Sequence, residues 1–205
     1  MATGATALGI PRPDGQGYAE TYSPDGRAVF YTRSSPVGRA IVERNLETGA
    51  ERIVYPAPKG RTVGDSSVSP DGRWLAFREG NAPTSIKVLR IESGEVREIV
   101  RVEEPDMIPG FGGINWTPDG RHLLFVRSSG ETGERTVWSV AVNGGAARKT
   151  ELKARSMRDL HLHPDGRRVA FTAGEGADEL WVLEHLLRPS TPAAATPTSR
   201  REMKR

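Results

Sequence analysis

Residues 69–76 read SPDGRWLA, and close variants of this stretch occur three more times in the chain. The other copies are SPDGRAVF at 23–30, TPDGRHLL at 117–124 and HPDGRRVA at 163–170. From one copy to the next the spacing is 46, 48 and 46 residues. A nearly fixed spacing of this size indicates a repeat architecture, in which each repeat is one unit that buries its core by stacking on its neighbours.

The shared Pro-Asp-Gly sequence predicts a tight hairpin turn in each repeat. Proline has the φ that the second position of a type I turn requires, aspartate suits the next position, and glycine accepts the left-handed conformation that closes the hairpin. The motif is therefore first a folding device. The predicted turn residues are Pro24, Asp25, Gly26, Pro70, Asp71, Gly72, Pro118, Asp119, Gly120, Pro164, Asp165 and Gly166.

Each turn lies among short β-rich segments. In the second repeat, residues 64–69 precede the turn, 73–79 follow it, and two further β-rich runs occupy 85–92 and 96–102. The other repeats have the same pattern, except that the third run of the last repeat, ELWVLE, continues directly into EHLLRPS. Four short antiparallel strands in each repeat are typical of a β-propeller blade. The sequence therefore predicts an all-β protein.

The repeat resembles the TolB-like (WD-repeat-like) β-propeller family. The resemblance rests on an apolar residue, Ser or Thr, Pro-Asp-Gly-Arg and an apolar strand, as in VSPDGRWLAF at 68–77 and WTPDGRHLLF at 116–125. It covers residues 18–188 and implies four blades of four-stranded antiparallel sheet, with expected bounds of 18–62, 63–108, 109–154 and 155–188. Because the propellers of this family normally close with more than four blades, we expect an open or partial propeller.

The two ends of the chain differ from the repeats. Residues 1–17 form an N-terminal segment with a candidate closing strand around 6–10, and residues 189–205 are a Pro/Ala/Thr-rich basic tail that we expect to be disordered. The N-terminus has no basic region followed by an apolar stretch, so the chain as given is expected in the cytoplasm, or in the periplasm if the natural N-terminus lies upstream. No segment is apolar enough for membrane insertion.

Composition argues against several classes of function. Residues 188–205 hold five basic side chains and one acidic one, so the formal charge of +3 becomes −1 for the rest of the chain, and nucleic acid is not an expected partner. The four tryptophans, Trp74, Trp116, Trp138 and Trp181, lie in predicted strands, which favours core packing. The chain has no cysteine, no Gly-x-Ser-x-Gly motif and no Walker loop. We therefore expect no enzymatic activity and no cofactor.

The strand before each turn gives the candidate binding residues. The position two before each turn proline is apolar in all four repeats: Tyr22, Val68, Trp116 and Leu162. One position earlier the residues are polar: Thr21, Ser67, Asn115 and His161. Because side chains alternate between the two faces of a strand, the apolar set should pack between blades. The polar set should face the central channel, where it could bind a ligand.

A metal site is an alternative at the last repeat. His161 and His163 are two residues apart, a spacing that places both on one face of a strand, and Asp159 shares that face. Against a metal, His163 takes the turn position that is Ser or Thr in the other repeats. The turn aspartates belong to four different blades, so they are expected to form turns and not to bind calcium. We predict no metal site.

The resemblance leaves the function open between two classes. We expect a non-catalytic bacterial scaffold that binds a protein or peptide partner and that can also self-associate through exposed blade faces. The alternative is a detached propeller domain of a larger hydrolase of the prolyl-oligopeptidase type, or of a sensor kinase or transcription regulator. A fold of this kind does not by itself decide between them.

Overall fold

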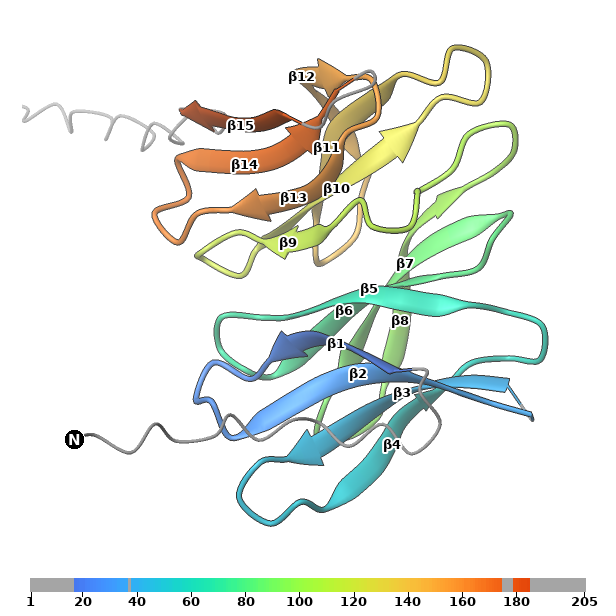
Figure 1. Cartoon of the computed structure of the whole chain (residues 1–205), viewed down its shortest axis with the longest axis vertical. Helices are drawn as coiled ribbons and strands as arrows, with labels where there is room; N and C mark the ends of the chain where they lie inside the picture. The colour runs from blue at the N-terminus through green and yellow to red at the C-terminus, as the bar shows by residue number, and fades with distance from the viewer. Residues whose placement is uncertain (1–16, 37, 175–178, 185–205) are drawn as a thin grey trace, which may run out of the picture.

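The structure is a computed structural model that describes residues 17–36, 38–174 and 179–184. In this part of the chain all regular elements are β-strands, which form four antiparallel sheets. The sheets are the blades of a β-propeller and follow one another in chain order along an arc, with blades 1 and 4 at its two ends (Figure 1). The all-β four-blade propeller predicted from the sequence is confirmed. The described residues include no helix of the length and hydropathy needed to cross a membrane.

In every blade the strands are hydrogen-bonded in the order in which they occur along the chain. Blade 1 contains β1 (Gly17–Tyr22), β2 (Ala28–Ser35), β3 (Gly38–Asn45) and β4 (Glu51–Pro56). Blade 2 contains β5 (Val63–Val68), β6 (Trp74–Glu79), β7 (Thr84–Arg90) and β8 (Val96–Val102). Blade 3 contains β9 (Ile114–Trp116), β10 (His122–Ser128), β11 (Arg135–Ala141) and β12 (Arg148–Ala154). In the described residues, blade 4 consists of β13 (Arg158–Leu162), β14 (Arg168–Ala173) and β15 (Glu179–Glu184).

Each Pro-Asp-Gly turn connects the first and second strands of its blade. In blade 2, Gly72 has a φ of 72° and donates its N–H to the carbonyl of Ser69 at 2.9 Å. The Ser69 hydroxyl donates to the Asp71 carboxylate at 2.6 Å and accepts the N–H of Trp74 at 2.9 Å. The hydroxyls of Ser23 and Thr117 make the same pair of contacts in blades 1 and 3. The motif therefore closes the hairpin and also positions the first residue of the second strand.

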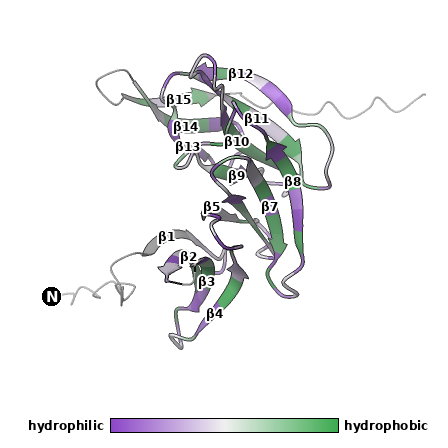
Figure 2. Cartoon of the chain, turned by 90° about the vertical axis from the view of Figure 1, so that its right-hand side faces the viewer, coloured by the Kyte–Doolittle hydropathy of each residue, from purple (hydrophilic) through white to green (hydrophobic). Residues whose placement is uncertain are grey.

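Alternation along the second strands packs each blade against its neighbours. In β10, Leu123 and Phe125 belong to the apolar cluster shared with blade 2. Their neighbours Leu124 and Val126 point the other way, into the cluster shared with blade 4. A third cluster lies between blades 1 and 2. Figure 2 shows the hydrophobic residues that run along β7, whose Ile86 is fully buried. Each interior blade therefore buries both of its faces.

The apolar residues before the turns follow this pattern with one exception. Val68 and Leu162 pack against the clusters of their blades, and Trp116 is only 7% exposed between blades 2 and 3. Tyr22 is 58% exposed, so the prediction that it packs between blades is wrong. Blade 1 is at the end of the arc, and the described residues supply no further blade to cover Tyr22.

Some sequence predictions concern residues at the margins of the described chain. The candidate closing strand around 6–10 and the basic tail at 189–205 lie outside the described residues. Among the tryptophans, Trp74 and Trp138 pack partly buried against the cluster of blades 2 and 3. Trp181 is 49% exposed, contrary to the prediction of core packing, because β15 is the outermost described strand of blade 4.

Candidate functional site

The four inner strands line a central cavity of about 850 Å³. These strands are β1, β5, β9 and β13, and each contacts the inner strand of the next blade along the chain. The cavity is lined by all four predicted channel-side residues, Thr21, Ser67, Asn115 and His161. The structure thus brings one polar residue from each blade to a single concave surface.

Asn115 differs from the other three predicted residues in that its side chain links two blades. Its amide nitrogen donates to the carbonyl of Leu160 at 2.7 Å, and its amide oxygen accepts the N–H of Leu162 at 3.0 Å. Both ends of the amide therefore hold β13 of blade 4 beside β9 of blade 3. Asn115 shapes the wall of the cavity, and the remaining polar positions are more available to a ligand.

Among non-glycine residues, left-handed backbone conformations are concentrated in this cavity. Four described non-glycine residues have a positive φ, and three of them line it: Asp65 (52°), Phe111 (61°) and Asp159 (51°). Asp65 and Asp159 each lie at an irregularity in the pairing of an inner strand with its neighbour. Irregularities of this kind re-aim side chains and occur often beside functional sites.

Asp65 and Asp159 occupy the same position in their repeats, five residues before the turn proline. In the third repeat this position is Gly113, whose φ is 78°. An aspartate or glycine is therefore found wherever the described inner strand turns into the left-handed region, because these two residue types adopt it most readily. The aligned position is a signal in the sequence that the alternation of faces does not show.

Phe111 lies in the connection between blades 2 and 3, and its side chain is 72% exposed. Its N–H donates to the Asp65 carboxylate at 3.0 Å, and its carbonyl accepts the N–H of Asp159 at 2.8 Å. A Cβ on Gly113 would lie 2.5 Å from the carbonyl oxygen of Leu160, so this loop is pressed against blade 4. Blades 2 and 4 thus hold the backbone of Phe111, and its phenyl ring is exposed at the cavity.

The charged residues of the cavity fall into a paired and an unpaired set. Arg78 and Asp65 form an ion pair at 3.1 Å, and Arg78 also donates to the carbonyl of Gly80 at 2.6 Å. Arg39 of blade 1 and Asp159 of blade 4 are exposed and form no ion pair in the described part of the chain. The cavity therefore offers one free positive charge and one free negative charge on opposite end blades.

The structure separates the two histidines that the sequence analysis considered together. His161 lines the cavity, whereas β13 ends at Leu162 and His163 belongs to the turn. His163 Nδ1 accepts the N–H of Asp165 at 3.2 Å, in place of the hydroxyl contact of the other turns. The expectation that both imidazoles share one strand face is wrong, because the strand ends between them. Within the described ranges, no group of three or more His, Cys, Asp or Glu side chains could hold a metal ion.

The turn aspartates are held by their own turns. Hydrogen bonds from Ser23, Ser69 and Thr117 are the largest cause of the lowered pKa values of Asp25, Asp71 and Asp119, respectively. In the last turn, the backbone N–H of Arg167 and then the guanidinium of Arg168 lower the pKa of Asp165 to about 2. These carboxylates are ionised at neutral pH, and their contacts give them a structural role in the turns.

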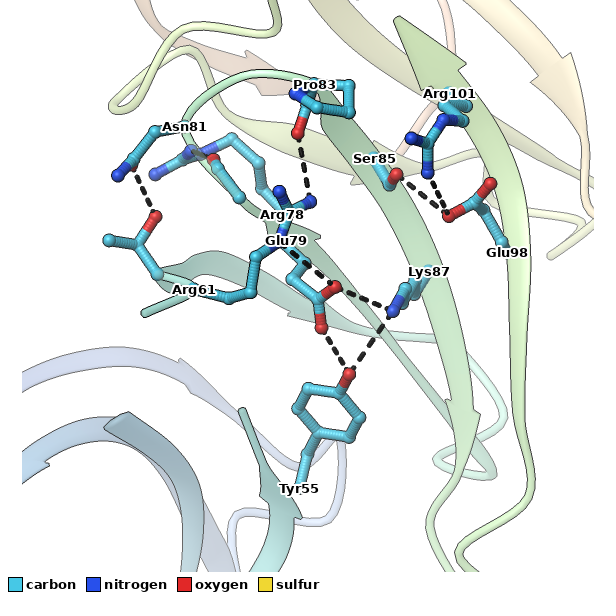
Figure 3. Close-up of polar contacts among 12 residues, drawn as sticks. Tyr55, Arg61, Arg78, Glu79, Asn81, Pro83, Ser85, Lys87, Glu98 and Arg101 are labelled. Carbon is cyan, nitrogen blue, oxygen red and sulfur yellow. Dashed lines mark hydrogen bonds and ion pairs between the residues drawn. The ribbon is translucent and has the colours of Figure 1, made fainter. Parts of the chain in front are cut away.

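A second polar cluster lies between blades 1 and 2 (Figure 3). The Glu79 carboxylate, 4% exposed, accepts hydrogen bonds from the Tyr55 hydroxyl and from Lys87 Nζ, the latter at 2.7 Å. Burial opposes ionisation of Glu79, but the hydrogen bonds from Lys87 and Tyr55 outweigh it and the pKa of this carboxyl is lowered. Arg61 Nε lies 3.8 Å from the same carboxylate. None of these side chains lines the central cavity, so the cluster ties blade 1 to blade 2.

Comparisons with known proteins find similarity in sequence to one protein and in structure to others. No protein-family model matches the chain. The uncharacterized peptidase YuxL of Bacillus subtilis (strain 168) is 31% identical over 123 residues, which are 54% of this chain and 17% of YuxL. The crystal structure of TolB from Acinetobacter baumannii matches with a TM-score of 0.69 and 19% identity, over 86% of this chain and 43% of TolB. A puromycin-hydrolyzing peptidase of Mycobacterium tuberculosis matches with a TM-score of 0.57 and 22% identity, over 80% of this chain and 29% of the peptidase.

The chain therefore has the β-propeller fold found in TolB, and the same fold occurs within the peptidase. At identities of 19% and 22%, the structural likeness shows the fold alone. The chain spans 17% of the length of YuxL and less than half of either structure. Function must accordingly be argued from the cavity itself.

Proposed function

We propose that this chain binds a peptide segment of a partner protein in the central cavity and does not act on it chemically. The observation that carries the proposal is the cavity of about 850 Å³, to which all four blades contribute side chains. Its volume is in the range of about 300–1,000 Å³ that is typical of specific ligand sites. A short extended segment of polypeptide fits within such a volume.

The chemistry of the lining supports a peptide as the ligand. Thr21 and Ser67 offer hydroxyl groups, which can donate to peptide carbonyls and accept from peptide N–H groups. Phe111 supplies an exposed apolar surface, and Arg39 and Asp159 supply free charges of both signs. A polypeptide presents matching groups along its length: backbone N–H and C=O groups, apolar side chains and charged side chains. Each of these groups that the cavity satisfies adds to the specificity of binding.

The test is binding of the purified chain to an array of short random peptides, compared with a variant whose cavity is filled. Ser67→Arg places a long side chain in the cavity, and Glu131→Gln is the control because Glu131 is exposed outside the cavity lining. We expect binding to fall by about tenfold or more in Ser67→Arg and to be unchanged in Glu131→Gln. Thr21→Arg is the second filling variant if Ser67→Arg folds poorly. Equal binding by the wild type and a folded filled variant would refute the proposal.

The 31% identity with YuxL over 123 residues favours a second candidate, a propeller that belongs with a peptidase domain. In that case the cavity faces a hydrolase domain, and the peptide that it holds is a substrate of that domain. The two candidates differ in the partner that binds most tightly. Stable association of the purified chain with the isolated catalytic domain of YuxL, measured by calorimetry, would favour the peptidase candidate. Absence of association together with peptide binding on the array would favour the first.

A further inference from the structure

We propose that Phe111 and Asp159 form a subsite for a single basic side chain, lysine or arginine, of the bound peptide. The inference rests on the proposed function, because it specifies what one part of the central cavity recognises. The aliphatic stem of the basic residue would pack on the phenyl ring of Phe111. Its charged head would pair with the carboxylate of Asp159.

The first argument comes from the backbone of Phe111. A phenylalanine with a φ of 61° is strained, and such a conformation persists only where the surrounding structure imposes it. Here the Asp65 carboxylate holds the N–H of Phe111 at 3.0 Å, and the N–H of Asp159 holds its carbonyl at 2.8 Å. The first contact comes from blade 2 and the second from blade 4. The backbone that carries the ring is therefore fixed before any ligand arrives.

The second argument concerns why the residue is aromatic. The loop sequence at 109–113 is Pro-Gly-Phe-Gly-Gly, and a glycine at the central position would adopt the same backbone without strain. The ring does not contribute to the core, since it is 72% exposed, and it does not belong to any of the three apolar clusters. Folding alone therefore gives no reason for the phenyl group. Contact with a ligand gives one, because an aromatic side chain has only two side-chain torsions to lose and so binds apolar surface at little entropic cost.

The third argument concerns the charge beside the ring. Of the two aspartates in the cavity, Asp65 is paired with Arg78 at 3.1 Å and also accepts the N–H of Phe111. Asp159 is exposed and forms no ion pair among the residues described. The backbone N–H of Asp159 donates to the carbonyl of Phe111. An unpaired carboxylate and an exposed ring therefore lie on two hydrogen-bonded residues. Arg39, the free cation of the cavity, lies on β3 of blade 1 and is not hydrogen-bonded to this loop.

Among side chains, only lysine and arginine can contact the Phe111 ring and pair with the Asp159 carboxylate at once. Their methylene stems pack on apolar surface while the charged heads reach a polar partner. A cation near the ring face is also attracted by the ring itself. An acidic side chain would be repelled by Asp159. A purely apolar side chain would bury the Asp159 carboxylate without a partner, which is unfavourable.

The experiment follows the backbone amide signals of the isotopically labelled chain by NMR during titration with three capped peptides. The probes are Ac-Ala-Arg-Ala-NH2, Ac-Ala-Glu-Ala-NH2 and Ac-Ala-Leu-Ala-NH2. We expect the arginine peptide to shift the signals of Phe111 and Asp159 at about tenfold lower concentration than the other two. The affinity for this peptide should fall as salt is added, because the Asp159 carboxylate is exposed and its pairing is screened.

Two variants and two matched controls locate the effect. Asp159→Asn and Phe111→Ala should each weaken binding of the arginine peptide by about tenfold, and Asp159→Asn should also remove the salt dependence. Tyr22→Ala and Glu131→Gln remove an exposed aromatic ring and an exposed charge outside the cavity, and should leave binding unchanged. The spectrum of each free variant reports whether it is folded.

The outcomes separate the subsite from the proposed function. If the three peptides shift Thr21 and Ser67 equally well, or the folded cavity variants bind arginine peptide as the wild type does, the subsite is wrong and the cavity remains a peptide site. If none of the peptides shifts any cavity signal and the peptide array is also unaffected by filling the cavity, both inferences fail. A preference for the arginine peptide that Asp159→Asn abolishes supports the subsite.

Discussion

Trp116 and Phe111 are five residues apart in the sequence, yet they lie in opposite environments. Trp116 is 7% exposed in the core between blades 2 and 3, and its indole N–H donates to the carbonyl of Ser67 at 2.9 Å. Phe111 is 72% exposed at the central cavity, and its backbone is held in the left-handed region. Closely packed apolar side chains form the core. Strand irregularities, a strained loop, one ion pair and two unpaired charges surround the cavity.

The difference indicates that stability and binding are carried by separate residues of the same inner strands. Alternation directs Trp116 into the core and its neighbour Asn115 to the cavity. The interblade core should therefore lose free energy of unfolding when a side chain is shortened. Removing the ring of Phe111 at the cavity should leave the free energy of unfolding unchanged or raise it, while binding is lost. The following predictions test this contrast, beginning with the largest expected effect.

Trp116→Ala should lower the free energy of unfolding by about 3–5 kcal/mol, because it leaves a cavity in the core and removes the hydrogen bond from the indole N–H to the Ser67 carbonyl. Urea denaturation followed by circular dichroism measures the change. Trp181→Ala is the control, since Trp181 is 49% exposed on β15 and should lose far less. Similar losses in the two variants would contradict the assignment of Trp116 to the core.

Glu79→Gln should lower the free energy of unfolding by about 2–3 kcal/mol, because it removes the negative charge that pairs with Lys87 at 2.7 Å in a buried site. Glu43→Gln is the matched control: Glu43 also pairs with a cation, Arg52, but that partner is half exposed. The same denaturation experiment compares the two. A loss no larger than that of the control would show that the cluster between blades 1 and 2 contributes little.

Gly166→Val should destabilise the protein by about 1–3 kcal/mol, because a β-branched side chain is forced to a φ near 68°. The turn of the preceding blade adds to this cost, since a Cβ on Gly166 would lie 3.0 Å from the ring of Pro118. Gly26→Val has the same backbone strain, but nothing lies within 4 Å of its Cβ. The melting temperature of Gly166→Val should therefore be lower than that of Gly26→Val. The opposite order would rule out stacking of successive turns.

Phe111→Gly should raise the free energy of unfolding by up to about 1 kcal/mol, because glycine adopts a φ of 61° without strain. Phe111→Ala keeps a Cβ and the strain, so its stability should be close to that of the wild type. Both variants should bind peptides less well than the wild type. Destabilisation by Phe111→Gly would mean that the ring contributes to folding, and would remove the contrast with Trp116.

The fold was predictable from the sequence because its determinants are local and are repeated. Four Pro-Asp-Gly turns and the two-residue alternation around them suffice to identify the blades and to place Thr21 and Ser67 at the channel. The same alternation fails at Tyr22, since burial depends on a neighbouring blade that sequence spacing does not supply. Which blade faces stay exposed is a property of the assembled arc.

The cavity residues that the sequence analysis missed lie where alternation breaks down. Asp65 lies at a strand irregularity, and the position five residues before the turn proline would have drawn attention to it, since it is Asp or Gly in repeats 2, 3 and 4 and these residues are unusual inside a strand. Phe111 has no counterpart in the other repeats. Its loop, residues 103–113, is the longest connection between the described blades, so only the 48-residue spacing and the glycines around Phe111 indicated a special structure.

The smallest predicted effect concerns the turn of blade 4 at low pH. The pKa of Asp165 is lowered from 3.8 to about 2, first by the N–H of Arg167 and then by Arg168, so this carboxylate stabilises the folded state only when it is ionised. Its contribution is complete above the unfolded pKa of 3.8 and is lost as the pH falls through about 2. Asp165→Asn cannot titrate, so the difference in unfolding free energy between wild type and variant should be constant above pH 5 and shrink between about pH 4 and pH 2. Urea denaturation across this range measures it, with Glu131→Gln as the control, because Glu131 is an exposed carboxylate outside the Pro-Asp-Gly turns. A difference that does not change with pH would show that the turn contacts favour the neutral carboxyl as much as the ionised one, and that the turns depend on glycine geometry alone.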